Sequence, residues 1–125
     1  MLKQLLLITI GGGLGASSRF LISNGVYGLL GRNFPYGTLI VNIIGSFAMG
    51  ILYILLLERI AFSEELRALL LVGFLGALTT FSTFSIETLL LLEQGLLFKA
   101  LLNIILSVSF CLATCWLGLI MGRTL

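Results

Sequence analysis

Residues 66–92 read LRALLLVGFLGALTTFSTFSIETLLLL, and the character of this stretch decides the fold. The stretch is longer than the roughly 20 mostly apolar residues that a helix needs to cross a bilayer. Only Arg67 and Glu87 are charged, yet residues 79–85 contain five hydroxyl side chains and two phenylalanines. The stretch therefore predicts a membrane-spanning segment with an unusually polar centre.

The whole chain shares this apolar character. Hydrophobic residues make up 59% of its 125 residues, charged residues make up 10%, and the mean hydropathy is +1.21. A soluble domain of this size keeps too much exposed surface to hide so many apolar side chains. Apolar stretches separated by short polar loops cover about residues 3–30, 38–57, 66–92 and 97–121. We predict one all-α integral membrane domain over residues 1–125 with four transmembrane helices, the first retained rather than cleaved as a signal.

The polar centre of the third span fits two structures. Gly76 precedes a cluster of serine and threonine residues, whose side chains can bond to helix carbonyls and loosen the helix. A broken helix is tolerated at membrane depth where it is buried or lines a cavity, and its free carbonyls can bind a cation. The alternative is a regular helix whose hydroxyl groups bond within it. The residues of this span leave both structures open.

Polar stripes run along two neighbouring spans. In each stripe, polar residues follow one another at intervals of four and so share one helix face. The stripes are Thr38, Asn42 and Ser46 in the second span and Asn103, Ser107 and Cys111 in the fourth. They indicate either a water-accessible path or hydrogen bonds that hold the helices together, and we favour the path.

Two charged residues, Arg19 and Glu87, lie within or near the membrane, where ionisable side chains are functional by default. They could pair and so offset the cost of burying each charge. Alternatively, Arg19 could extend to the interface, because it lies near one end of its helix.

Composition argues against several classes of function. A net charge of +2 with scattered basic residues gives no sign of nucleic-acid binding. The sequence has no histidine and no recognisable nucleophile, base or metal cluster, so we expect no enzyme. Cys111 and Cys115 share a helix face, but two thiols alone make a poor metal site and commonly serve as packing residues.

Small residues spaced by four occur in every span and allow helices to approach closely in lipid. The pairs are Gly11 and Gly15, Ser46 and Gly50, Gly73 and Ala77, and Gly118 and Gly122. Four such faces suggest more contact surface than one bundle uses, so we expect a homodimer. Basic residues number four on the side of the termini and two on the other side, a weak bias that leaves insertion in both orientations open.

Three motifs resemble the Fluc (CrcB) family of bacterial fluoride channels. Residues 76–85, GALTTFSTFS, resemble its G-x-L-[ST]-T-F-S-T-F-S signature, and residues 37–42, GTLIVN, resemble its G-T-L-x-x-N. Residues 10–15, IGGGLG, which lead to Arg19, resemble its first-span pattern. The resemblance extends over essentially the whole chain and includes its length and four-span layout.

The resemblance implies an antiparallel, dual-topology homodimer in the bacterial cytoplasmic (inner) membrane. Such a dimer has two pores for passive export of fluoride and a structural sodium ion, Na+, between its subunits. The implied pore residues are Asn42, Phe81, Phe84, Ser82, Thr83, Thr38, Ser107 and Glu87, with Arg19 in a structural role. The resemblance also implies a break in the third helix, where backbone carbonyls of Gly76 and Thr79 would bind the sodium ion. The role of Cys111 stays open, because a thiol is a weaker hydrogen-bonding group than a hydroxyl.

Two rival functions remain from the residues themselves. A small multidrug exporter is also a dual-topology dimer with four spans, but that class uses a central carboxylate in its first span, where this chain has Arg19. In a non-transporting assembly subunit, the polar stripes would only join helices.

Overall fold

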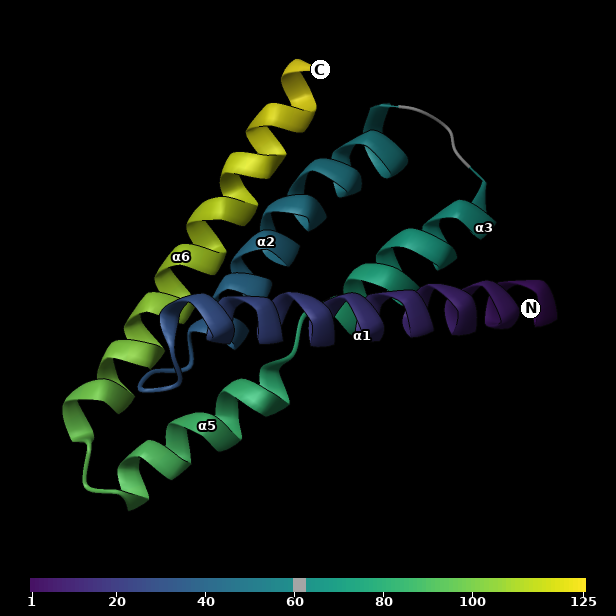
Figure 1. The fold of residues 1–125 in the computed structure, drawn as a ribbon. Helices are drawn as coiled ribbons and strands as arrows, with labels where there is room; N and C mark the ends of the chain where they lie inside the picture. Colours follow the sequence, from purple (N-terminus) through teal and green to yellow (C-terminus); the bar gives the residue numbers. More distant parts are fainter. Residues whose placement is uncertain (60–62) are drawn as a thin grey trace.

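Four long helical segments make up the computed structural model, which describes residues 1–59 and 63–125 (Figure 1). The first segment is α1 (Leu2–Leu30), and the second is α2 (Tyr36–Tyr53) with its π-helical continuation η1 (Ile54–Arg59). The third consists of α3 (Glu64–Arg67), the π-helical η2 (Ala68–Leu75), α4 (Gly76–Leu78) and α5 (Phe81–Glu93), and the fourth is α6 (Leu97–Thr124). Each segment is long and apolar enough to cross a membrane, which confirms the prediction of four spans.

The third span is broken between α4 and α5, which confirms the predicted break over the alternative of a regular helix. Thr79 (φ −87°, ψ 155°) and Thr80 (φ −151°, ψ 114°) both have extended backbones. The Thr80 hydroxyl then accepts a hydrogen bond from the Thr83 N–H at 3.2 Å and caps the new helix. Figure 1 shows α5 running from this link toward the N-terminal end of α6.

Glycines bring α1 into backbone contact with η2. A Cβ atom added to Gly11 would overlap the Leu69 carbonyl oxygen, and one added to Gly15 would overlap the Phe74 carbonyl oxygen. Across the same contact, a Cβ on Gly73 would lie 2.9 Å from the Ile8 carbonyl oxygen. In lipid, helices associate through such close approaches.

A second glycine contact joins α2 to α6. A Cβ on Gly50 would overlap the Cys115 carbonyl oxygen, and one on Gly118 would overlap the Phe47 carbonyl oxygen. Contacts within one chain therefore already use most of the small-residue pairs from which a dimer contact was predicted. The homodimer stays a prediction.

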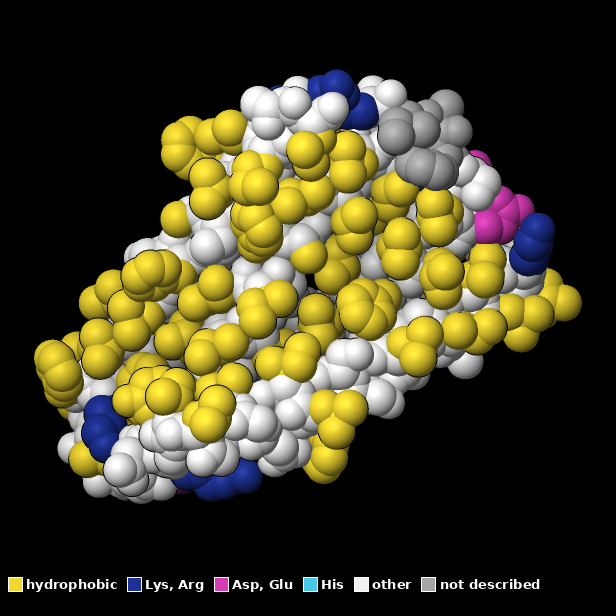
Figure 2. Space-filling model, turned by 45° about the horizontal axis from the view of Figure 1, so that its top comes forward, with side chains coloured by type: hydrophobic (Ala, Val, Ile, Leu, Met, Phe, Trp, Pro, Cys, Tyr) yellow, Lys and Arg dark blue, Asp and Glu magenta, His cyan; other side chains and the backbone are white. Residues whose placement is uncertain are grey.

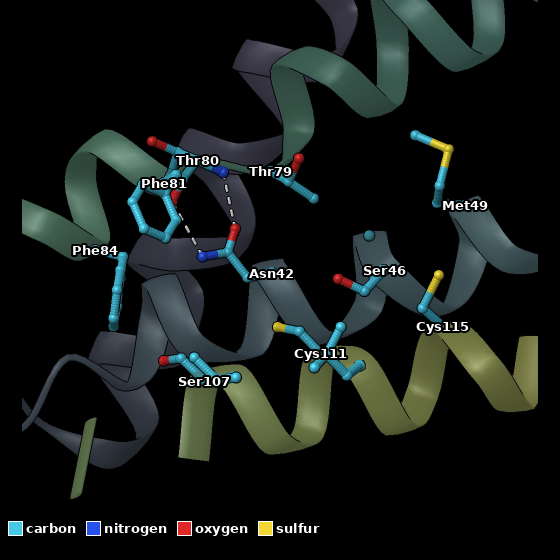
Figure 3. A pocket seen from close by; sticks show the side chains of 13 residues that line it. Asn42, Ser46, Met49, Thr79, Thr80, Phe81, Phe84, Ser107, Cys111 and Cys115 are labelled. Carbon is cyan, nitrogen blue, oxygen red and sulfur yellow. Dashed lines mark hydrogen bonds between the residues drawn. The ribbon is translucent and has the colours of Figure 1, made fainter. Parts of the chain in front are cut away.

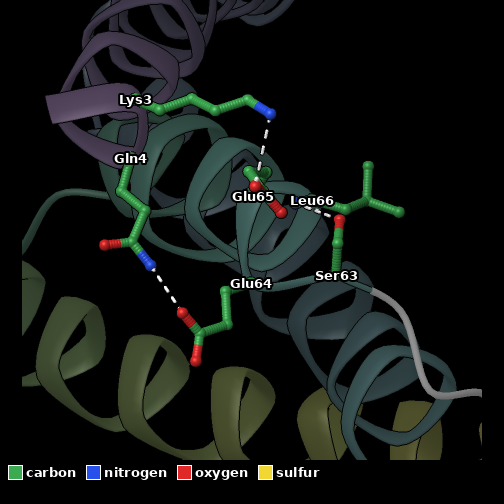
Figure 4. A network of polar contacts seen from close by, with 6 residues as sticks. All are labelled: Lys3, Gln4, Ser63, Glu64, Glu65 and Leu66. Carbon is green, nitrogen blue, oxygen red and sulfur yellow. Dashed lines mark hydrogen bonds and ion pairs between the residues drawn. The ribbon is translucent and has the colours of Figure 1, made fainter. Parts of the chain in front are cut away.

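The outer surface is apolar along the spans and charged at their ends. Figure 2 shows hydrophobic side chains spread over most of one face, with Lys, Arg, Asp and Glu gathered near the ends of the helices. At one such end, Lys3 pairs with Glu65 at 3.3 Å, and Gln4 donates to Glu64 at 2.9 Å (Figure 4). These polar contacts join the start of α1 to α3, as expected where both helices reach the surface of the membrane.

Candidate functional site

The helix break is held by one side chain from another span. The Asn42 amide nitrogen donates to the Thr80 carbonyl oxygen at 3.1 Å, and the Thr80 N–H donates to the Asn42 amide oxygen at 2.8 Å (Figure 3). Asn42 is only 9% exposed. A buried backbone group without a hydrogen bond is costly in a membrane. These two bonds satisfy both backbone groups of Thr80 and so stabilise its extended conformation.

A cavity of about 370 Å³ opens beside the break, between α2, α5 and α6. Figure 3 shows Phe81 and Phe84 near one end of this cavity and Met49 and Cys115 near the other. Four of the predicted pore residues line it, and these are Asn42, Phe81, Phe84 and Ser107. The motif residues and the fourth-span stripe, far apart in the sequence, thus meet at one place.

The two phenylalanines of the motif form a tilted pair. Their ring centroids are 5.3 Å apart and their planes meet at 50°. Phe84 is 8% exposed, whereas Phe81 is 76% exposed and projects from the surface of this chain. An aromatic ring carries partial positive charge at its edge, so tilted rings at a cavity wall can direct that edge toward an anion.

A second cavity of about 420 Å³ lies between α1, α2 and α5 and is more polar. Four predicted residues line it, and these are Arg19, Thr38, Thr83 and Glu87. The Glu87 carboxylate accepts hydrogen bonds from the Tyr27 hydroxyl at 3.0 Å and from the Thr38 hydroxyl. Within residues 1–59 and 63–125 the side-chain ion pairs join other residues, so Arg19 and Glu87 share a cavity without pairing.

A third cavity of about 330 Å³ lies next to the loop between α1 and α2. It shares Tyr27, Arg32 and Glu87 with the second cavity, and the second shares Thr80 with the first. Arg32 stacks over the Tyr27 ring at 4.7 Å, and Lys99 also lines the third cavity. Neighbouring cavities therefore share lining residues from the charged loop to the helix break, and the cavity at the break is the most apolar of the three.

Known proteins resemble the chain over nearly its full length. Residues 6–119 match the family described as CrcB-like protein, Camphor Resistance (CrcB). The chain belongs to this family. A relative from Coxiella burnetii is 55% identical over 98% of this chain and 99% of its own length. A relative from Pseudoalteromonas translucida is 58% identical over 90% of this chain and 94% of its own.

A relative from Methylococcus capsulatus is 56% identical over 98% of this chain. The chain spans about half the length of that relative, since the match covers 54% of it. All three relatives carry the description "Fluoride-specific ion channel FluC". Together with the four spans, these matches make the CrcB-family chain a multi-pass bacterial membrane protein.

Thr80 also organises the hydroxyl groups of the CrcB-family motif. Its hydroxyl lies 3.2 Å from the Ser82 hydroxyl and 3.1 Å from the Thr83 hydroxyl. Ser82 is exposed, whereas Thr83 lines the second cavity. Both predicted hydroxyl residues thus lie at the start of α5, but only Thr83 lines one of the three cavities.

The carbonyl groups predicted to bind sodium lose their helical donors at the break. In a continuous helix, the Thr80 N–H would donate to the Gly76 carbonyl, and the Thr83 N–H to the Thr79 carbonyl. Here the first N–H bonds to Asn42 and the second to the Thr80 hydroxyl. Released carbonyl oxygens suit a hard cation, so the geometry fits the predicted role of Gly76 and Thr79.

A buried chain of hydrogen bonds joins α5 to α6 in this CrcB-family protein. Ser107 donates to Asn103 at 3.4 Å, Asn103 donates to Thr88 at 2.9 Å, and Thr88 donates to the Phe84 carbonyl at 2.7 Å. Asn103 is 2% exposed, and its hydrogen bond to Thr88 holds α6 against α5. The fourth-span stripe therefore divides: Asn103 joins helices, whereas Ser107 and Cys111 line the cavity.

Two residues of the site were missed in the sequence, Tyr27 and Thr88. Tyr27 bonds to Glu87, and Thr88 receives Asn103. Thr88 is a hydroxyl four residues after Phe84, on the same face of α5, and this spacing was a usable signal. Tyr27 gave no comparable signal, because its partner, Glu87, lies on a different helix, α5.

Proposed function

We propose that this protein is a fluoride-selective passive ion channel that exports fluoride from the cytoplasm down its electrochemical gradient. The observation that carries the proposal is the Asn42–Thr80 pairing, because it holds the helix break beside a cavity lined by the two motif phenylalanines. The description that the relatives carry agrees with this assignment. The protein is a channel and not an enzyme.

The physical chemistry of fluoride explains the value of a passive channel. Neutral hydrogen fluoride crosses membranes, ionises in the more alkaline cytoplasm and is trapped there as the anion. A narrow pathway lined by hydrogen-bond donors can replace the hydration shell of a small anion better than that of a larger one. Export then follows the gradient and requires no nucleotide site.

We further propose that the working unit is an antiparallel homodimer with dual topology and two pores. Phe81 supports this arrangement, since its ring is 76% exposed next to the cavity and a second chain would enclose it. The released carbonyls of Gly76 and Thr79 are too few to surround a cation alone. A second chain related by a two-fold axis would add the same two groups and complete a structural Na+ site.

The proposal assigns roles to the residues around the break. Phe81 and Phe84 direct ring edges toward fluoride, while Asn42, Ser82, Thr83 and Ser107 supply polar groups nearby. Thr38 and Glu87 lie in the second cavity on the way from the loop, and Arg19 sits on its wall as a structural cation.

Fluoride efflux from liposomes tests the assignment. Purified protein is reconstituted into vesicles loaded with potassium fluoride or potassium chloride, and valinomycin starts the efflux, which an ion-selective electrode records. We expect rapid loss of fluoride and almost none of chloride. Similar rates for both anions would overturn the proposal, and an absence of flux from folded protein would favour the assembly subunit.

A further inference from the structure

The third cavity lies at one end of the spans, between the loop that joins α1 to α2 and the turn that joins α5 to α6. Figure 1 shows this loop and the start of α6 on the same side of the molecule, away from both termini. Connections between membrane spans lie outside the hydrocarbon region, at the level of the lipid head groups. The cavity is therefore placed where a head group can enter it.

Two basic side chains, Arg32 and Lys99, reach this cavity from elements far apart in the sequence. The Arg32 guanidinium donates to the Asn24 amide oxygen at 3.3 Å and lies 4.7 Å from the centre of the Tyr27 ring. The Lys99 ammonium donates to the Asn33 carbonyl oxygen at 2.9 Å. A guanidinium has five N–H donors and an ammonium has three. Each cation is thus held in place and keeps donors for a ligand.

The charges on the cavity lining do not cancel. Among the residues that the structure describes, the side-chain ion pairs lie at the other end of the spans, so Arg32 and Lys99 have no carboxylate partner. The carboxylate in the lining, Glu87, accepts hydrogen bonds from the hydroxyl groups of Tyr27 and Thr38. Two cations and one carboxylate leave an excess of one positive charge, which suits an anion with a single charge.

We propose that the third cavity binds the head group of an anionic phospholipid, with the phosphate between Arg32 and Lys99. The guanidinium fork matches the geometry of phosphate oxygens, and the ammonium adds a compact second charge. Basic pockets between transmembrane helices are a recurring form of anionic lipid site.

The chemistry of the lining favours phosphatidylglycerol over phosphatidylcholine. The glycerol head group adds hydroxyls, which Asn33 and Gln94 on the cavity lining can bond. A choline head group adds a cation, which the two basic side chains would repel. An aromatic ring could attract choline, but Arg32 already covers the Tyr27 ring.

Apolar surface beside the cavity suits the acyl chains. Leu29 and Phe98, which are close to Arg32 and Lys99 in the sequence, are 87% and 76% exposed. The cavity volume of about 330 Å³ is at the lower end of the range for small-molecule sites, about 300–1,000 Å³, so it suits the head group alone. A free phosphate ion would gain nothing from the apolar surface, whereas a phospholipid would.

Native mass spectrometry of the whole chain tests the proposal. Protein freed of lipid in detergent is titrated with dioleoylphosphatidylglycerol or dioleoylphosphatidylcholine, and the bound lipid per chain is counted. We expect one tightly bound phosphatidylglycerol per chain, with an affinity about tenfold or more above that of phosphatidylcholine. Arg32→Gln and Lys99→Gln should each weaken phosphatidylglycerol binding about fivefold, since one basic residue is removed, whereas Lys99→Arg should retain it.

The matched control removes two cations at the other end of the spans. The double variant Lys3→Gln and Arg123→Gln should bind phosphatidylglycerol like the unchanged chain, whereas the double variant Arg32→Gln and Lys99→Gln should lose its preference for that lipid. Equal affinity of the unchanged chain for both lipids would overturn the proposal. An equal loss in the two double variants would overturn it too, because net charge alone would then explain the binding.

Competition with sodium phosphate at constant ionic strength separates a lipid site from a site for the free ion. We expect phosphatidylglycerol to stay bound in millimolar phosphate. Its displacement by phosphate would refute the lipid assignment. These measurements involve no fluoride flux, so their result does not depend on the proposed function.

Discussion

Replacing Asn42 with Leu should uncouple the helix break from α2. Leucine has a similar size but forms no hydrogen bonds, so the Thr80 N–H and carbonyl would both lose their partner. A buried polar group left unsatisfied costs about 1–3 kcal/mol, and two groups therefore cost about 2–6 kcal/mol. Folded proteins are stable by only about 5–15 kcal/mol, so a loss of this size is readily measured.

The assay is unfolding in mixed micelles by titration with sodium dodecyl sulfate. The single tryptophan, Trp116 on α6, reports the transition by fluorescence. Asn33→Leu is the matched control, because Asn33 is exposed in the loop before α2 and should change stability by no more than about 0.5 kcal/mol. If Asn42→Leu unfolds as the unchanged chain does, the amide pairing does not hold the break and this reasoning is refuted.

Three further predictions concern the rings, the glycine contacts and the orientation. Phe81→Leu and Phe84→Leu keep much of the side-chain volume but remove the positive ring edge, so fluoride efflux per folded dimer should fall by about tenfold or more, equivalent to about 1.4 kcal/mol. Phe98→Leu, which is equally exposed at 76%, should leave efflux unchanged, and near-normal efflux in both motif variants would return those rings to a packing role. Gly50→Ala should destabilise the fold by about 1–3 kcal/mol in the same unfolding assay, because its Cβ would overlap a carbonyl oxygen of α6, whereas Gly25→Ala has open space and should be neutral or stabilising. Adding three lysines to one loop should bias insertion and reduce fluoride resistance of cells, with recovery when an oppositely biased copy is co-expressed; full activity of one uniformly oriented population would contradict dual topology.

The spans were predictable from the sequence because hydropathy is a local property. The residues alone left the break open, since the hydroxyls of residues 79–85 fit a regular helix equally well, and only the family resemblance implied it. The deciding contact comes from Asn42, nearly forty positions earlier, whose amide pairs with Thr80. A contact between distant segments leaves no trace in the periodicity of either one.

The charged pair illustrates the same limit. The sequence offered Arg19 as one partner for Glu87, because opposite charges in a membrane commonly pair. In the structure, hydroxyl groups of Tyr27 and Thr38 bind the carboxylate instead. A sequence shows which residues are charged, whereas the partner of Glu87 depends on how close Tyr27 of α1 and Thr38 of α2 lie to α5.

The break at Thr79–Thr80 also sets the electrostatics at membrane depth. Each half-helix has its own macrodipole, with a partial positive charge at its N-terminus and a partial negative charge at its C-terminus. The break therefore places the positive pole of α5 beside Phe81 and the cavity, and the negative pole of α4 at the released carbonyls of Gly76 and Thr79. One interruption of one helix thus presents an anion and a cation with opposite poles a few residues apart, without a single ionised side chain in the linker.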